Sequence, residues 1–150
     1  ASSWADRLTA ICTPLSGFKP EDKFDLIFSN PPYYDSSLEN PDRREAAARH
    51  TGSLSHRDIL AFAADNLTAA GRLSLILPSE SLHSLRRCAV SFGLHPFRLL
   101  HISTTPNKPP RRVIAEFSTM KIAEKEDFLT LSTAGEKTAE YRLLTQDFYL

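Results

Sequence analysis

The stretch Phe24–Ser29, FDLIFS, runs directly into Asn30-Pro31-Pro32-Tyr33-Tyr34, NPPYY. A short, nearly continuous apolar run of this kind predicts a β-strand covered on both faces, as in a parallel sheet. Asn-Pro and Pro-Pro are ordinary turn signals, so the simplest interpretation is that the strand ends here. Consecutive prolines also fix φ and lack N–H donors, which holds the Asn30 amide rigidly and ready to accept hydrogen bonds from an amino group. An aromatic ring just after it is suited to stacking on a flat substrate.

The composition sets limits on the class of protein. The 150 residues include 18 basic and 18 acidic side chains, so the net charge of zero gives no overall electrostatic indication of nucleic-acid binding. There is no apolar window of membrane-spanning length and no signal peptide at the start, which predicts a soluble, cytoplasmic protein. Cys12 and Cys88 are far apart and the histidines lack ligand spacing, so we expect no metal site.

The order of apolar segments indicates how the chain is organised. Strands are predicted over residues 7–12, 24–29, 72–77, 96–104 and 111–121, with lesser strands over 128–133 and 141–144. Helices are predicted from a Ser55 cap to a stop at Gly71, and from Ser79 or Ser81 through Val90. The alternating pattern of 111–121 favours an antiparallel neighbour.

Strands that alternate with helices predict the fold class. We expect an α/β protein whose sheet carries helices on both faces. In such sheets, ligands bind beyond the carboxyl ends of the strands, and Asn30 lies at one such end. This position favours a functional interpretation of the NPPYY segment over a simple turn.

Two runs of basic residues stand out in an otherwise neutral sequence. The first lies in a long polar segment, residues 35–54, and comprises Arg43, Arg44, Arg49 and His50; the second comprises Lys108, Arg111 and Arg112. A solvated surface is the usual explanation of an isolated charge run. Because both runs flank loops expected at the carboxyl ends of strands, phosphate contact with RNA is the alternative.

The residues Phe24–Tyr33 resemble the catalytic-loop signature of class I S-adenosylmethionine-dependent methyltransferases that act on planar nitrogens. DNA adenine methyltransferases, some RNA methyltransferases and the glutamine methyltransferases of release factors share that signature. Residues 2–8, 38–60, 71–80, 106–117 and 146–150 are similar to the bacterial tRNA adenine N6-methyltransferases that modify adenosine 37 of a valine tRNA. The resemblance implies a Rossmann-like methyltransferase sheet with an antiparallel last strand pair.

The resemblance also implies roles for individual residues. The Asn30 side-chain oxygen and the Pro31 carbonyl would accept hydrogen bonds from the adenine amine, with Pro32 shaping the turn and Tyr33 stacking on the base. Tyr34 would contact substrate or pack against the following loop. S-adenosylmethionine would contact Asn30 and, in the loop after the family's third strand, Thr13, Pro14 and Leu15. The partner would be a tRNA anticodon loop.

One departure from the family pattern is the absence of the Gly-rich cofactor loop. The glycines at 17, 52, 71, 93 and 135 never approach a G-x-G spacing. We therefore expect residues 1–150 to be the C-terminal part of a single methyltransferase domain, with a catalytic loop at 29–34 and a substrate loop at 35–54. The cofactor-binding half would lie outside the sequence, leaving the fragment inactive and prone to associate through exposed core surface.

Three alternatives remain open from the sequence. The same motif would serve a glutamine methyltransferase of release factors, although the sequence after it does not resemble that family. It would also serve another N6-adenine methyltransferase of nucleic acid. The third alternative is a non-catalytic interaction domain that keeps the α/β scaffold without the cofactor half.

Overall fold

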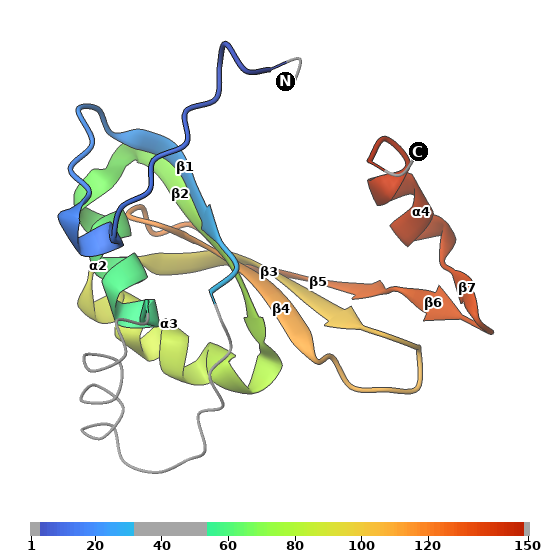
Figure 1. Cartoon of the computed structure of the whole chain (residues 1–150). Coiled ribbons are helices and arrows are strands. Elements are labelled where there is room, and N and C mark those ends of the chain that lie inside the picture. The colour runs from blue at the N-terminus through green and yellow to red at the C-terminus, as the bar shows by residue number, and fades with distance from the viewer. Residues whose placement is uncertain (1–3, 32–53, 149–150) are drawn as a thin grey trace.

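The computed structural model describes residues 4–31 and 54–148 (Figure 1). The helical elements are η1 (Leu15–Gly17), α2 (His56–Asn66), η2 (Ser79–Ser81), α3 (Leu82–Ser91) and α4 (Ala139–Thr145). The strands are β1 (Phe24–Ser29), β2 (Leu67–Pro78), β3 (His95–Ser103), β4 (Arg112–Ser118), β5 (Lys125–Thr130), β6 (Ser132–Thr133) and β7 (Glu136–Lys137). None of the helices within these residues is long and apolar enough to cross a membrane.

Five strands form a mixed sheet in the order β1-β2-β4-β3-β5. β1 is parallel to β2 and β5 is parallel to β3, whereas β4 is antiparallel to both β2 and β3. The carboxyl ends of β1, β2, β3 and β5 therefore meet the start of β4 at one edge of the sheet, which we call the carboxyl edge. A separate antiparallel pair, β6 and β7, follows β5. The predicted α/β sheet and its antiparallel last pair are confirmed.

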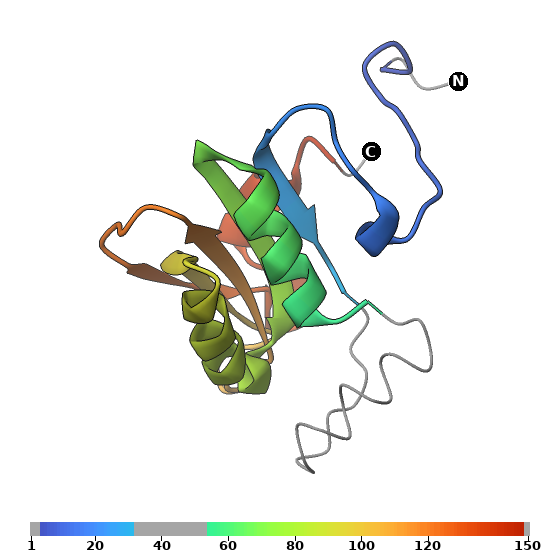
Figure 2. The ribbon, with the colours of Figure 1, turned by 90° about the vertical axis from the view of Figure 1, so that its left-hand side faces the viewer.

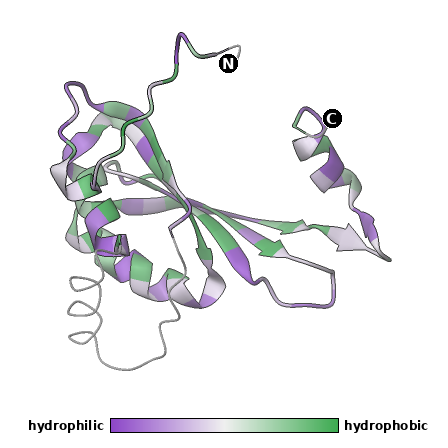
Figure 3. Ribbon diagram, in the orientation of Figure 1, coloured by the Kyte–Doolittle hydropathy of each residue, from purple (hydrophilic) through white to green (hydrophobic). Residues whose placement is uncertain are grey.

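The hydrophobic core lies between this sheet and the helices α2 and α3. Alternate residues of β2 and their partners on β4 point to one face, as expected from the two-residue period of a strand. This face and the two helices bury Ile59, Leu60, Ala63, Leu73, Leu75, Leu77, Leu85, Ala89, Leu99, Val113, Ala115 and Phe117. Figure 2 shows α2 and α3 side by side on this face, and Figure 3 shows apolar segments recurring along the strands.

The second face of the sheet is polar in its centre and partly exposed. Glu116 forms ion pairs with Arg72 at 3.7 Å and with Arg98 at 3.9 Å, and Arg98 also approaches Asp127 at 3.9 Å. On the same face, Leu26 is 44% exposed and Phe28 is 78% exposed. The expectation that residues 24–29 are covered on both faces is wrong among the described residues, because β1 is an edge strand with α2 on one face only. At the other edge, α4 contacts β5.

The amino end of β1 is held by aromatic packing. The rings of Phe18, Phe24 and Phe62 lie within 6.0–6.5 Å of one another, centroid to centroid, and join the segment before β1 to helix α2. Gly71 brings β2 close to the same point, because a Cβ there would lie 2.7 Å from the Phe24 carbonyl oxygen. A glycine is therefore required where β2 passes the Phe24 carbonyl.

Helix α2 begins as the sequence predicts. The Ser55 hydroxyl accepts a hydrogen bond from the Asp58 N–H at 3.1 Å, and the Asp58 carboxylate accepts one from the Ser55 N–H at 3.1 Å. This reciprocal capping box fixes the first turn of α2. The predicted stop at Gly71 is wrong, because the helix ends at Asn66 and Gly71 lies inside β2.

Two of the predicted strands do not form in the described part of the chain. Residues 7–12 form no strand, and their apolar members Leu8 and Ile11 are 64% and 58% exposed. Residues 141–144 belong to helix α4, which Thr138 caps by accepting a hydrogen bond from the Tyr141 N–H at 3.2 Å. In both cases a four- to six-residue apolar run carries too little periodicity to identify its secondary structure.

Candidate active site at the carboxyl edge

Asn30 and Pro31 lie directly beyond the end of β1. Ser29 pairs with Leu75, so Asn30 continues the strand at the level of Ile76 on β2. Asn30 is exposed, whereas Pro31 is buried. The buried ring fixes the backbone, and the amide next to it is presented at the carboxyl edge.

The remaining members of the predicted site lie outside the described residues. They are Pro32, Tyr33 and Tyr34 of the catalytic loop, and Arg43, Arg44, Arg49 and His50 of the substrate loop. Their roles stay predictions.

The second basic run lies at the same edge as Asn30. It belongs to the hairpin between β3 and β4, residues 104–112, which we call the basic hairpin; Figure 1 shows it projecting from the body of the sheet. Its base is held by two backbone hydrogen bonds, from Ser79 N–H to the Arg111 carbonyl at 3.2 Å and from Arg111 N–H to the Ile102 carbonyl at 3.0 Å. The end of β2 and the basic hairpin are thus joined directly.

The basic hairpin is strongly positive for its size. Residues 104–112, TTPNKPPRR, contain three basic side chains and no acidic one. Lys108, Arg111 and Arg112 are all exposed. In a protein of zero net charge, this loop concentrates positive potential at the carboxyl edge, which is the charge pattern that attracts phosphate groups.

His56 is a further polar side chain at this edge that sequence reasoning missed. It occupies the first residue of α2, and burial lowers the pKa of its imidazole below the ordinary value of 6.5. Its Nε2 atom is buried and has no hydrogen-bond partner within the described part of the chain. The sequence pattern gave no signal for it, because burial at a helix start depends on how the helix packs.

The lowered pKa predicts how acid affects the fold. The unfolded chain protonates His56 near pH 6.5, whereas the folded chain does so only at lower pH. Between these values the unfolded state binds more protons, so the free energy of unfolding falls as the pH falls below about 6.5. We expect His56→Gln to reduce the difference in free energy of unfolding between pH 7 and pH 5, measured by urea unfolding.

The matched control for this measurement is His83→Gln, because His83 is exposed on α3. The control is expected to keep the wild-type difference between the two pH values. An equal difference in the wild type and in His56→Gln would contradict the prediction.

Three residues predicted to contact the cofactor, Thr13, Pro14 and Leu15, follow a segment that forms no strand. Thr13 and Pro14 are exposed, and Leu15 starts η1 and packs against the core beside α2. Because residues 4–12 form no strand before them, the placement on which their prediction depended is not met. Their contact with a cofactor stays a prediction without structural support.

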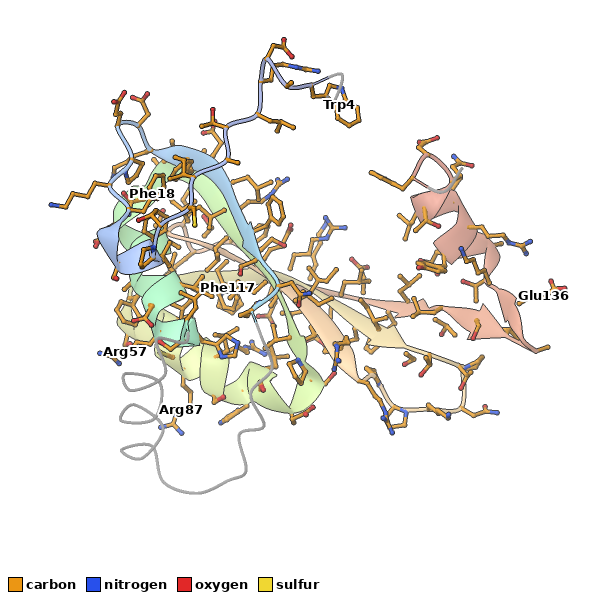
Figure 4. All side chains as sticks on the ribbon, in the orientation of Figure 1. Trp4, Phe18, Arg57, Arg87, Phe117 and Glu136 are labelled. Carbon is orange, nitrogen blue, oxygen red and sulfur yellow. The ribbon has the colours of Figure 1, made fainter. Side chains whose placement is uncertain are left out.

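Two open grooves lie on the described part of the molecule. One of about 470 Å³ runs along α3, lined by Ser79, Leu82, His83, Arg86, Arg87 and Val90, and another of about 570 Å³ lies beside α4. Figure 4 shows Arg87 pointing outward from α3. Across residues 4–31 and 54–148, no three His, Cys, Asp or Glu side chains gather as metal ligands.

The fold is shared with a solved methyltransferase structure. A crystal structure titled as a predicted O-methyltransferase, protein Atu636 from Agrobacterium tumefaciens, superposes with a TM-score of 0.57 over 85% of this chain and 53% of its own, at 18% identity. This likeness establishes the fold class of the chain. No protein-family profile matches the sequence.

Relatives are found by sequence over nearly the whole chain. Proteins named tRNA1(Val) (adenine(37)-N6)-methyltransferase from Parabacteroides distasonis and Bacteroides fragilis are 38% and 33% identical over 99% of this chain. The protein of that name from Vibrio campbellii is 30% identical over the same share. The chain spans 65%, 65% and 62% of the length of these three relatives. It is therefore homologous to these proteins over about two-thirds of their length.

Proposed function

We propose that the protein containing this chain is an S-adenosylmethionine-dependent methyltransferase that modifies N6 of an adenine in tRNA, at adenosine 37 of a valine tRNA. The observation that carries the proposal is the exposed Asn30 amide beside the buried Pro31, at the carboxyl edge of a methyltransferase-type sheet. The names of the relatives support the substrate. Because the proposed substrate is tRNA, we propose that the protein acts in the cytoplasm.

The Asn30–Pro31 segment solves the main chemical problem of this reaction. An adenine amine is a poor nucleophile, because its lone pair is delocalised into the ring. Hydrogen bonds from its two N–H groups to the Asn30 side-chain oxygen and the Pro31 carbonyl would favour a pyramidal nitrogen and direct its lone pair outward. Because these acceptors are held by the end of β1 and by a buried ring, they need no reorganisation during the reaction.

We propose that Tyr33 stacks on the adenine, with Tyr34 and the substrate loop closing over it. An unpaired anticodon-loop nucleotide is easier to extrude than a paired one. Arg43, Arg44, Arg49 and His50 would then meet phosphates on one side of the base, and the basic hairpin would meet them on the other.

The methyl donor needs residues that this sequence does not provide. S-adenosylmethionine, when bound, would supply an electrophilic methyl group. We propose that Asn30 borders it, but the sequence contains no G-x-G loop to surround it. We propose that residues 1–150 form the C-terminal part of one methyltransferase domain. The free edge of β1, with the exposed Leu26 and Phe28, would be covered by the cofactor-binding part or, without it, by association.

A methyl-transfer assay tests the proposed function. The complete encoded protein and the 150-residue chain are each incubated with labelled S-adenosylmethionine and either tRNA or a release factor. We expect the complete protein to label tRNA and the chain alone to label neither. Labelling of the release factor would favour a glutamine methyltransferase, which would use the same clamp for a side-chain amide. Labelling of neither substrate by the complete protein would favour a non-catalytic interaction domain.

The proposed phosphate contacts of the basic hairpin predict how charge reversal there changes RNA binding. The double variant Lys108→Glu and Arg111→Glu is expected to weaken binding of the chain to tRNA. It should also reduce the slope of log affinity against log salt by about 1 for each phosphate that the variant no longer binds. Fluorescence anisotropy of a labelled tRNA at several salt concentrations measures both effects.

The control for the hairpin variant is Lys121→Glu. Lys121 is exposed just after β4, at the opposite edge of the sheet. The substitution changes the net charge without altering the carboxyl edge, so its salt slope should match that of the wild type. Equal salt slopes for wild type and the double variant would show that the hairpin is only a solvated surface.

A further inference from the structure

Phe128 on β5 is an exposed aromatic residue with an ordered neighbour. Its side chain is 67% exposed, and its ring lies 5.0 Å from the His101 imidazole, centroid to centroid, with 20° between the two planes. The two rings thus form a stacked pair whose outer member faces solvent. We call this pair the His101–Phe128 stack.

The strand register places this stack near the carboxyl edge. His101 pairs with Val113 on β4 and with Phe128 on β5, and Val113 pairs with Leu77, the penultimate residue of β2. These residues point to the same face as the core. Phe128 nevertheless remains exposed, because β5 is the edge strand of the sheet.

The stack is ordered before any ligand arrives. His101 is only 16% exposed on its side chain, and its Nε2 lies 3.4 Å from a carboxylate oxygen of Glu126. The imidazole is held between the sheet and the Phe128 ring, and its Nε2 has no hydrogen-bond partner among the described residues. A base that stacks on Phe128 therefore meets a fixed ring, and binding needs little side-chain ordering.

The surroundings favour a nucleotide over an apolar protein partner. The exposed residues just before Phe128 on β5 are Glu126 and Asp127, and Leu129 after it is buried, so the aromatic ring does not continue into an apolar patch along its strand. The basic hairpin begins three residues after His101, directly beyond the end of β3. An exposed aromatic ring beside clustered positive charge is the usual composition of a single-stranded RNA site.

We propose that the His101–Phe128 stack binds one unpaired base of the RNA substrate while the basic hairpin contacts the adjoining phosphates. This inference rests on the proposed function and adds a second base-binding site to it. Four strand spacings separate β1 from β5, roughly 19 Å at about 4.8 Å each. The base on Phe128 is therefore a different nucleotide from the adenine at Asn30. The two sites together would bind two nucleotides of the same RNA loop.

An RNA-binding measurement on the complete encoded protein tests the proposal without methyl transfer. The probe is an anticodon stem-loop RNA that carries 2-aminopurine at each unpaired position in turn, and the competitor is a fully paired RNA. Fluorescence quenching at one position other than the target adenosine should report stacking. Phe128→Ala is expected to abolish that quenching and to weaken binding by about 5- to 150-fold, the range found when a stacking ring is removed.

Three further measurements make the result specific. Phe128→Trp should restore both quenching and affinity, since it restores a flat ring. Phe148→Ala removes a ring that is 83% exposed beyond α4 and should leave both unchanged. Phe128→Ala should also keep the wild-type salt slope, which separates loss of stacking from loss of phosphate binding.

Each outcome decides the proposal. If the wild type binds the stem-loop and Phe128→Ala binds it equally well, the stack is not a base-binding site and the proposed function still stands. If the wild type binds neither RNA, both the stack and the tRNA substrate are contradicted. Loss of stem-loop binding in Phe128→Ala with an unchanged melting temperature supports the inference.

Discussion

Asn30→Ala is expected to reduce methyl transfer to tRNA by about 10²-fold or more in the complete encoded protein. Removing the side-chain amide deletes one of the two acceptors proposed to hold the adenine amine, and reductions of this size follow removal of a preorganised polar group at a reacting centre. The effect should appear in kcat more than in KM, because the hydrogen bond strengthens as the amine attacks. Single-turnover transfer of labelled methyl groups measures it.

Two further variants separate this effect from damage to the fold. Asn30→Asp keeps an oxygen acceptor in the same place and should retain more activity than Asn30→Ala. Asn66→Ala makes the same chemical change at the end of α2, where the amide donates to the Phe62 carbonyl, and should leave the rate unchanged. A normal rate for Asn30→Ala would rule out the proposed role of this amide.

Phe117→Ala is expected to lower the free energy of unfolding by about 3–5 kcal/mol. Phe117 is fully buried on β4, where it pairs with Leu73 on one side and Pro96 on the other. Figure 4 shows it inside the body formed by the sheet and the two helices. Its truncation leaves a cavity that the surrounding strands cannot close. Urea unfolding followed by circular dichroism gives the change.

The comparison for this variant is Phe148→Ala, which removes the same ring from an exposed position. It should change the free energy of unfolding by less than about 0.5 kcal/mol. A decrease for Phe117→Ala no larger than that of Phe148→Ala would mean that the sheet is not the cooperative core of this chain.

Much of the fold could be predicted from residue patterns. The run Phe24–Ser29 identified β1, and the Ser55 cap identified the start of α2, because caps and apolar runs act through near neighbours. The alternation in residues 111–121 identified β4 as an antiparallel strand for the same reason.

Predictions from the sequence failed where contacts between residues far apart in the chain determine the structure. The exposure of Phe28 depends on which face α2 covers, and the place of Gly71 inside β2 depends on the Phe24 carbonyl lying against it. Residues 141–144 form a helix because Thr138 caps its start. The short apolar run in these residues predicted a strand instead.

Only some residues of the candidate site could be predicted from the sequence. Asn30, Pro31 and the basic hairpin could be predicted, because strand ends and charge runs are visible in a sequence. The His101–Phe128 stack could not, since it requires the parallel register of β3 and β5. His56 was likewise recognisable only once its burial was known.

The prolines of the basic hairpin have a consequence for the speed of recognition. Three of its nine residues are proline, at 106, 109 and 110, and the turn is closed by a hydrogen bond from Lys108 N–H to the Thr105 carbonyl at 3.1 Å. A loop restricted in this way has few conformations to search. Its basic side chains are therefore already in position when RNA arrives. Binding then needs no slow ordering of the loop. Glycines at these positions would make capture slower even if every charge were kept.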